Sequence, residues 1–120
     1  MRLGPLLAAS ALTIALAGCA PSISGINARP DKYYQHKVSF VGEIVRRQDL
    51  PGETLLEVAD AHGGRILVRS ADQVEAESGD WVKVRGLLVP EAKVGGTLLY
   101  DVVLAERIAP TRAPRLRNLM

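Results

Sequence analysis

The side chains most often used in catalysis are scarce in this sequence. His36 and His62 are the only histidines, and Cys19 is the only cysteine. Two histidines could form an acid–base pair or bind a metal, but histidines at the ends of expected strands are more often surface residues. No serine lies in a nucleophile-elbow context, and no spacing of Cys, His, Asp and Glu matches a metal site. We therefore expect no enzymatic activity, no cofactor and no metal.

Four arginines could instead bind an anion: Arg46, Arg47, Arg65 and Arg69. Guanidinium groups suit phosphate and carboxylate, but proteins that bind single-stranded nucleic acid also need exposed aromatic rings. Phe40 is expected in the core, so this surface offers no exposed aromatic ring. The net charge of the chain, +2, is also small. Nucleic acid is therefore not expected as a partner. The open alternatives are an anion or an oligosaccharide bound by the arginines, or simple pairing of Glu57 with them across strands.

Trp81 is the aromatic side chain best placed to anchor a partner. Val82 and Val84 take the inward phase of the expected strand, so Trp81 points to the other face. If exposed, it would anchor a protein partner. The alternative is that a neighbouring helix or the tail covers it.

The elements that position these residues begin with a repeated pattern. Val38-x-Phe40-x-Gly42-x-Ile44-Val45 matches Val82-x-Val84-x-Gly86-x-Leu88-Val89. Alternating apolar residues predict strands, and a glycine inside a strand often marks a bend. Two long bent strands that lie side by side predict a sheet that curls on itself.

Five strands are expected in all, over residues 37–48, 54–60, 65–70, 81–89 and 97–108. In the last strand, Leu98, Tyr100, Val102 and Leu104 are expected on one face. Ala71–Glu77 contains helix formers and a single apolar anchor, Val74, which predicts a short helix or helical turn. Asp60, at the end of the second strand, is expected to shape the following turn.

The first eighteen residues have the features of an export signal, with Arg2 followed by an apolar core from Leu6 to Leu16. Leu16-Ala17-Gly18-Cys19 resembles the bacterial lipobox, which implies a lipid on Cys19. An ordinary secretory signal is the alternative. Stable attachment needs more than one acyl chain, as such a lipid provides. Ala20 after the cysteine implies sorting to the outer membrane.

The pattern of strands resembles the OB-fold over Val38 to Ile108. The resemblance implies an all-β, five-stranded Greek-key barrel with a short helix between strands three and four. Another small barrel or an open sandwich is the alternative. Members of this fold often bind oligonucleotides or oligosaccharides on strands two and three, between the one–two and four–five loops. The expected organisation is a signal peptide (1–18), a lipidated tether (19–29), a barrel domain (30–109) and a basic flexible tail (110–120).

Part of the chain also resembles the Slp-type outer-membrane lipoproteins, in the lipobox, Pro30 to Tyr33, the glycine-bearing first strand and Thr54 to Val58. The predicted function is a non-catalytic, lipid-anchored cell-envelope module that engages a protein or another envelope component. It is expected at the periplasmic face of the outer membrane. The alternative is anion or oligosaccharide binding on strands two and three.

Overall fold

The computed structural model describes residues 21–114, and the leader, Cys19 and residues 115–120 lie outside the described part. A short helix and a 3-10 turn precede five strands: α2 (Ile23–Ala28), η1 (Pro30–Lys32), β1 (Lys37–Leu50), β2 (Glu53–Ala59), β3 (Arg65–Ser70), β4 (Trp81–Val94) and β5 (Thr97–Pro110). Over residues 21–114, no helix has the length and apolar character needed to cross a membrane.

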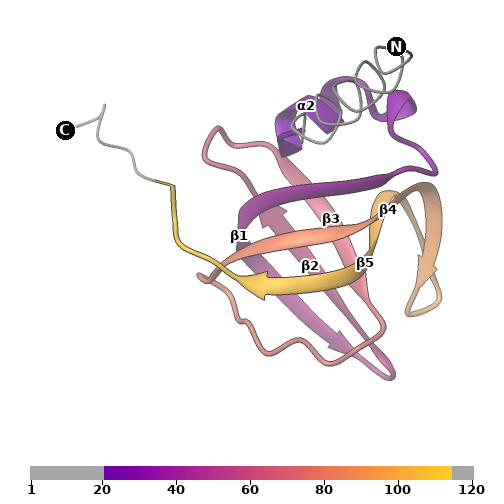
Figure 1. The fold of residues 1–120 in the computed structure, drawn as a ribbon. Coiled ribbons are helices and arrows are strands. Elements are labelled where there is room, and N and C mark those ends of the chain that lie inside the picture. The colour runs from indigo at the N-terminus through magenta and orange to yellow at the C-terminus, as the bar shows by residue number, and fades with distance from the viewer. Residues whose placement is uncertain (1–20, 115–120) are drawn as a thin grey trace, which may run out of the picture.

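The five strands close into a barrel in the order β1-β2-β3-β5-β4 (Figure 1). Neighbouring strands are antiparallel except β3 and β5, which run parallel for a short stretch with Leu67 opposite Val102. This order, with one parallel closure, is that of an OB-type Greek-key barrel. The expected all-β, five-stranded fold is confirmed.

The two glycines of the repeated pattern lie where strands approach closely. β1 and β4 pair antiparallel around Phe40 and Val84, which places Gly42 opposite Val82 and Gly86 opposite Val38. A Cβ on Gly42 would lie 2.6 Å from Cγ1 of Val58. A Cβ on Gly86 would meet the β5 backbone at Leu104 and Ala105. Glycine is thus required at both positions by packing between strands.

One apolar core fills the barrel, with contributions from every strand and from α2. Its fully buried members include Ile23, Ile44, Leu56, Val58, Val68, Val82, Val84 and Leu88. Inward residues alternate with outward ones along β1 to β3 as the sequence predicted.

The segment expected to be a tether contains a packed helix instead. Ser22 caps α2 by accepting a hydrogen bond from the Gly25 N–H at 3.0 Å. Ile23 and Ile26 are buried in the barrel core. Helix α2 lies above β1 in the view of Figure 1. The described part of the expected tether is therefore largely part of the folded body.

The prediction of a short helix or helical turn over Ala71–Glu77 is wrong. Residues 71–80 form no helix and cross one side of the barrel as an irregular connector. Val74 alone is buried there, at 6% exposure. A helix with a single apolar residue would bury little more surface than an extended chain, so the helix formers do not decide the conformation.

The fourth and fifth strands form a longer hairpin than expected. β4 runs through Pro90 to Val94, where a loop was predicted, and Gly95 and Gly96 make the turn with positive φ angles. Asp101 also has a positive φ, of 54°. The prediction that one face of β5 carries Leu98, Tyr100, Val102 and Leu104 is wrong. Val102 and Val103 are both buried, while Tyr100 is 63% exposed.

Candidate ligand-binding face

The outer face of β2 and β3 is the surface on which OB-folds commonly hold ligands. The phase predicted from the sequence is correct, since Leu56 and Val58 point inward while Leu55 and Glu57 lie on the outside, half-buried. In the register of the two strands, Glu57 is opposite Leu67, and Leu55 is opposite Arg69. This face therefore mixes apolar and charged side chains.

Glu57 joins two of the four candidate arginines. Its carboxylate accepts hydrogen bonds from Arg46 and from Arg65, each at 3.2 Å. The bond from Arg65, followed by that from Arg46, outweighs partial burial and lowers the pKa of Glu57. Arg46 and Arg65 remain largely exposed, so each keeps N–H groups that can reach a ligand.

Arg69 has a structural partner at the other end of the same face. It donates to Glu53 at 2.7 Å, and Glu53 also accepts the Gly95 N–H at 2.9 Å. These two bonds, that of Arg69 first, lower the pKa of Glu53. The tip of the β4–β5 hairpin is thereby fastened to the β1–β2 turn, so this end of the face carries the protein's own hairpin.

Arg47 supports the connector rather than the face. Its guanidinium donates to Asp49 at 3.0 Å and to the carbonyl oxygen of Ala76. The structure thus brings together two of the four predicted arginines, Arg46 and Arg65, and assigns Arg47 and Arg69 to other contacts.

A shallow cavity of about 410 Å³ lies beside Arg65, lined by Asn27, Glu57, Arg65, Ile66, Leu67, Tyr100 and Asp101. Tyr100 reaches it because β3 and β5 run parallel, with Leu67 opposite Val102. Two residues earlier on each strand lie Arg65 and Tyr100. An exposed aromatic ring is therefore present on this face, contrary to the prediction that the face has none.

Two hydrogen bonds involve residues that line the cavity with Tyr100. Tyr34 donates its hydroxyl hydrogen to Oδ1 of Asp101. That bond, with some desolvation, raises the pKa of Tyr34. Asn27 of α2, which also lines the cavity, donates to the Arg65 carbonyl oxygen at 2.8 Å and so joins α2 to β3.

Asp60 shapes the β2–β3 turn, as expected, and also secures α2. Its Oδ1 accepts the N–H groups of His62 and Gly64, at 2.9 and 2.8 Å. Its Oδ2 accepts the N–H and the hydroxyl of Ser24, at 3.0 and 2.7 Å. Burial alone would raise the pKa of Asp60, but these hydrogen bonds, led by the Ser24 hydroxyl, lower it.

The remaining predicted residues do not join the cavity. His36 and His62 make backbone hydrogen bonds at element ends. Within residues 21–114, no group of three or more His, Cys, Asp and Glu side chains could hold a metal ion. Trp81 is half-buried at the start of β4, opposite Glu43, and does not line the cavity.

Tyr100 is the residue that the sequence interpretation missed. The signals that could have found it are Pro90, which cannot donate to a ladder, and the Gly95-Gly96 pair, typical of a tight hairpin. Together they predict a projecting hairpin whose residues need not keep the inward phase of the barrel.

No protein-family model and no curated protein sequence matches the chain. Among solved structures, the chain is similar to a protein from Leishmania major Friedlin named as an aspartyl-tRNA synthetase, with TM-score 0.60, 10% identity, and coverage of 82% of this chain and 21% of that one. It is also similar to asparaginyl-tRNA synthetase from Pyrococcus horikoshii, with TM-score 0.51, 17% identity, and coverage of 69% and 21%. The chain thus spans about a fifth of the length of each synthetase, and at these identities the likeness shows the barrel fold alone.

Proposed function

We propose that this chain is a non-catalytic binding module of the cell envelope, held there by lipid on Cys19, and that it binds an oligosaccharide on the face beside Tyr100. The observation that carries the proposal is the exposed ring of Tyr100 next to Arg65 in a cavity on the outer face of the barrel. A ring against which a sugar can pack, with polar groups around it, is typical of small-ligand sites.

The charges around the cavity favour a neutral polar ligand over a polyanion. Arg46 and Arg65 share Glu57, and Arg69 is paired with Glu53. Binding to nucleic acid depends on a groove of uncompensated positive charge, which this pairing reduces. Glu57 and the arginines instead offer both acceptors and donors to hydroxyl groups.

The fold comparison gives no support to the expectation that nucleic acid is excluded. Both synthetases have tRNA in their names and contain a barrel similar to this one. A single-stranded oligonucleotide must therefore be tested beside the sugar. The Slp-type resemblance and the outer-membrane location belong to this proposal and rest on the sequence motifs.

The test is a titration of the protein with a soluble β-1,4-linked N-acetylglucosamine oligomer and, separately, with oligothymidylate. We expect binding of the sugar, weakened about tenfold by Tyr100→Ala, in line with the loss of one aromatic contact. Leu98→Ala is the matched control, because Leu98 is exposed on the same hairpin but does not line the cavity. Tight, steeply salt-dependent binding of oligothymidylate without sugar binding would contradict the proposal.

A further inference from the structure

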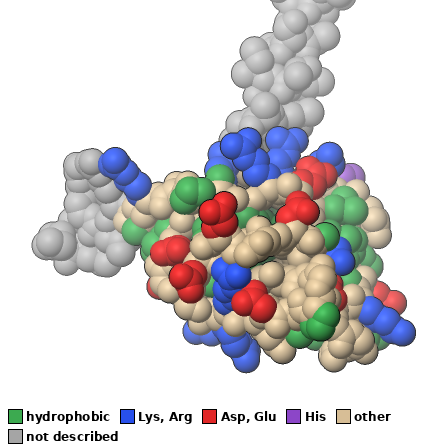
Figure 2. All heavy atoms as spheres, turned by 90° about the horizontal axis from the view of Figure 1, so that it is seen from below, with side chains coloured by type: hydrophobic (Ala, Val, Ile, Leu, Met, Phe, Trp, Pro, Cys, Tyr) green, Lys and Arg blue, Asp and Glu red, His purple; other side chains and the backbone are tan. Residues whose placement is uncertain are grey.

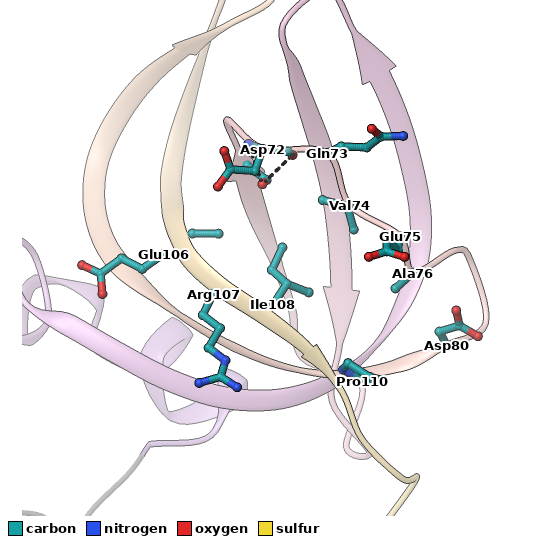
Figure 3. A pocket seen from close by; sticks show the side chains of 12 residues that line it. Asp72, Gln73, Val74, Glu75, Ala76, Asp80, Glu106, Arg107, Ile108 and Pro110 are labelled. Carbon is teal, nitrogen blue, oxygen red and sulfur yellow. Dashed lines mark hydrogen bonds between the residues drawn. The ribbon is translucent and has the colours of Figure 1, made fainter.

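A second hollow lies on the side of the barrel crossed by the connector. This cavity of about 510 Å³ is bounded on one wall by residues 72–76 of the connector and on the other by residues 105–110 of β5. Val74 and Ile108 face one another across it, whereas Arg107 extends away (Figure 3). The floor is continuous with the core, against which Ala76, Ala105 and Ile108 pack.

The connector wall is held by β1 and not by β5. Gly79 donates its N–H to Ile44 at 2.8 Å, and Ile44 donates its own to Asp80 at 2.9 Å. Arg47 of β1 binds the carbonyl oxygen of Ala76. At the other end, Ser70 accepts the Asp72 N–H at 3.2 Å, which turns the chain away from β5 directly after β3.

The β5 wall is therefore an open sheet edge. Pairing of β3 with β5 ends at Arg69 and Leu104, and in the described part of the chain no backbone hydrogen bond joins the connector to residues 105–110. On its other side, β5 pairs with β4 as far as Pro110. Every second residue of this stretch consequently directs its N–H and C=O toward the hollow. Such an edge is a template for an added strand.

The charge on the walls indicates which strand would fit. Four carboxylates line the hollow, those of Asp72, Glu75, Asp80 and Glu106, against the single arginine Arg107. Of these four, only Glu106 takes part in an ion pair among the described residues, with Lys37. Asp and Glu side chains are spread over the lower side of the molecule, interleaved with basic ones (Figure 2).

We propose that this hollow binds an extended segment of another protein, in which apolar and basic residues alternate, as an added strand on β5. Alternate side chains of such a strand point to opposite faces. The apolar ones would cover Val74 and Ile108, and the basic ones would meet the carboxylates of Asp72 and Glu75. This interaction uses a surface separate from the Tyr100 cavity and does not depend on sugar binding.

The test is a titration of isotope-labelled protein with a short synthetic peptide of alternating Val and Lys, followed by amide NMR and hydrogen exchange. We expect shifts in residues 72–76 and 105–110 and slower exchange of the β5 amides that face the hollow. Two matched peptides isolate the causes. One has Glu in place of Lys, and the other has alternate backbone amides N-methylated, which removes the donors needed for strand pairing. Each should bind at least about tenfold more weakly.

Charge reversal on the protein provides the complementary measurement. Asp72→Lys with Glu75→Lys should weaken binding of the Val–Lys peptide about tenfold, because the attraction becomes repulsion. Glu91→Lys, an exposed site on the hairpin, should leave binding unchanged, and the NMR spectrum of each variant checks its fold. Equal binding of the N-methylated peptide, shifts confined to residues outside the hollow, or no shifts at millimolar peptide would each overturn the proposal.

Discussion

Asp60 is the residue that joins the N-terminal helix to the barrel. Each of its carboxylate oxygens accepts two hydrogen bonds, one pair from the β2–β3 turn and one pair from Ser24. Gly64 lies so close that a Cβ there would be 2.5 Å from the Ser24 hydroxyl oxygen. The turn and the helix are therefore fitted to each other around one side chain.

Asp60→Ala should lower the free energy of unfolding by about 2–3 kcal/mol, because it leaves several donors without their charged acceptor. Asp60→Asn should cost less, since its amide oxygen still accepts on one side. Urea denaturation followed by circular dichroism measures both, with Asp31→Ala, an exposed site on η1, as the control. A loss for Asp60→Ala no larger than that of the control would show that the four bonds do not stabilise the fold.

The lowered pKa values of Glu53, Glu57 and Asp60 predict how stability depends on pH. A carboxyl group with a lower pKa in the folded state stabilises the fold above its unfolded pKa, and this contribution is lost as the pH falls through the folded value. Ordinary values are 4.5 for Glu and 3.8 for Asp. We expect constant stability from neutral pH down to about 5.5 and a decline below about 4.5.

Thermal melts across this pH range check the prediction. The variant Glu53→Gln/Glu57→Gln/Asp60→Asn should be less stable at neutral pH and show a flatter decline in acid. High salt should reduce the decline due to the exposed ion pairs of Glu57 more than that due to Asp60, which is held by neutral donors. If this variant still lost as much stability in acid as the unmodified protein, the loss would have to come from other carboxylates.

At the scale of single residues, Tyr100 shows why only part of the candidate site could be predicted from the sequence. Period-two alternation predicts Tyr100 and Val102 on the same face, because both have the same parity. The positive φ of Asp101 breaks that parity, and a non-glycine residue in this conformation is rare enough that a pattern does not anticipate it. The outward positions of Glu57, Arg65 and Arg69 were predicted correctly because β2 and β3 keep regular alternation.

At the scale of elements, Gly86 sets the packing of β4 against β5. The register of these strands shifts between Arg85 and Gly86, and a Cβ on Gly86 would lie 2.9 Å from the Ala105 Cα. Gly86→Ala must therefore separate two backbones and should destabilise the protein by about 1–3 kcal/mol. Gly25→Ala in α2, where the nearest atom is 3.3 Å away, is the control and should be near neutral. Chemical denaturation compares the two, and equal stabilities would contradict close packing as the role of Gly86.

The wrong prediction of a helix over Ala71–Glu77 and the failure to predict α2 have opposite reasons. Ala71–Glu77 has high helix propensity but only one apolar anchor, and tertiary attachment of the connector to β1 determines its path. Residues 23–28 are rich in small residues, yet Ser22 as a cap and the i, i+3 spacing of Ile23 and Ile26 were available signals for an amphipathic turn. Strands β1 to β3 were predicted well because each carries an alternation that one barrel can bury.

At the scale of the whole molecule, the docking of α2 limits how far the barrel could stand from the lipid that we propose on Cys19. Ser22, the cap of α2, lies three residues after Cys19. A fully extended chain of that length spans about 10 Å. The β2–β3 turn, bound to α2 through Asp60 and Ser24, should then lie close to the membrane, and the β1–β2 turn, on the opposite side from α2 in Figure 1, should face away.

This orientation predicts a difference in membrane proximity within one barrel. In the lipidated protein on vesicles, a fluorophore at His62→Cys should be quenched strongly by quenchers on lipid headgroups, and one at Pro51→Cys only weakly. A Gly-Ser linker inserted after Pro21 should remove most of the difference, because the barrel can then reorient freely. Mass spectrometry of the mature N-terminus establishes separately whether the lipid is present. Equal quenching at both sites in protein shown to carry the lipid would mean that α2 does not hold the barrel at a fixed angle to the membrane.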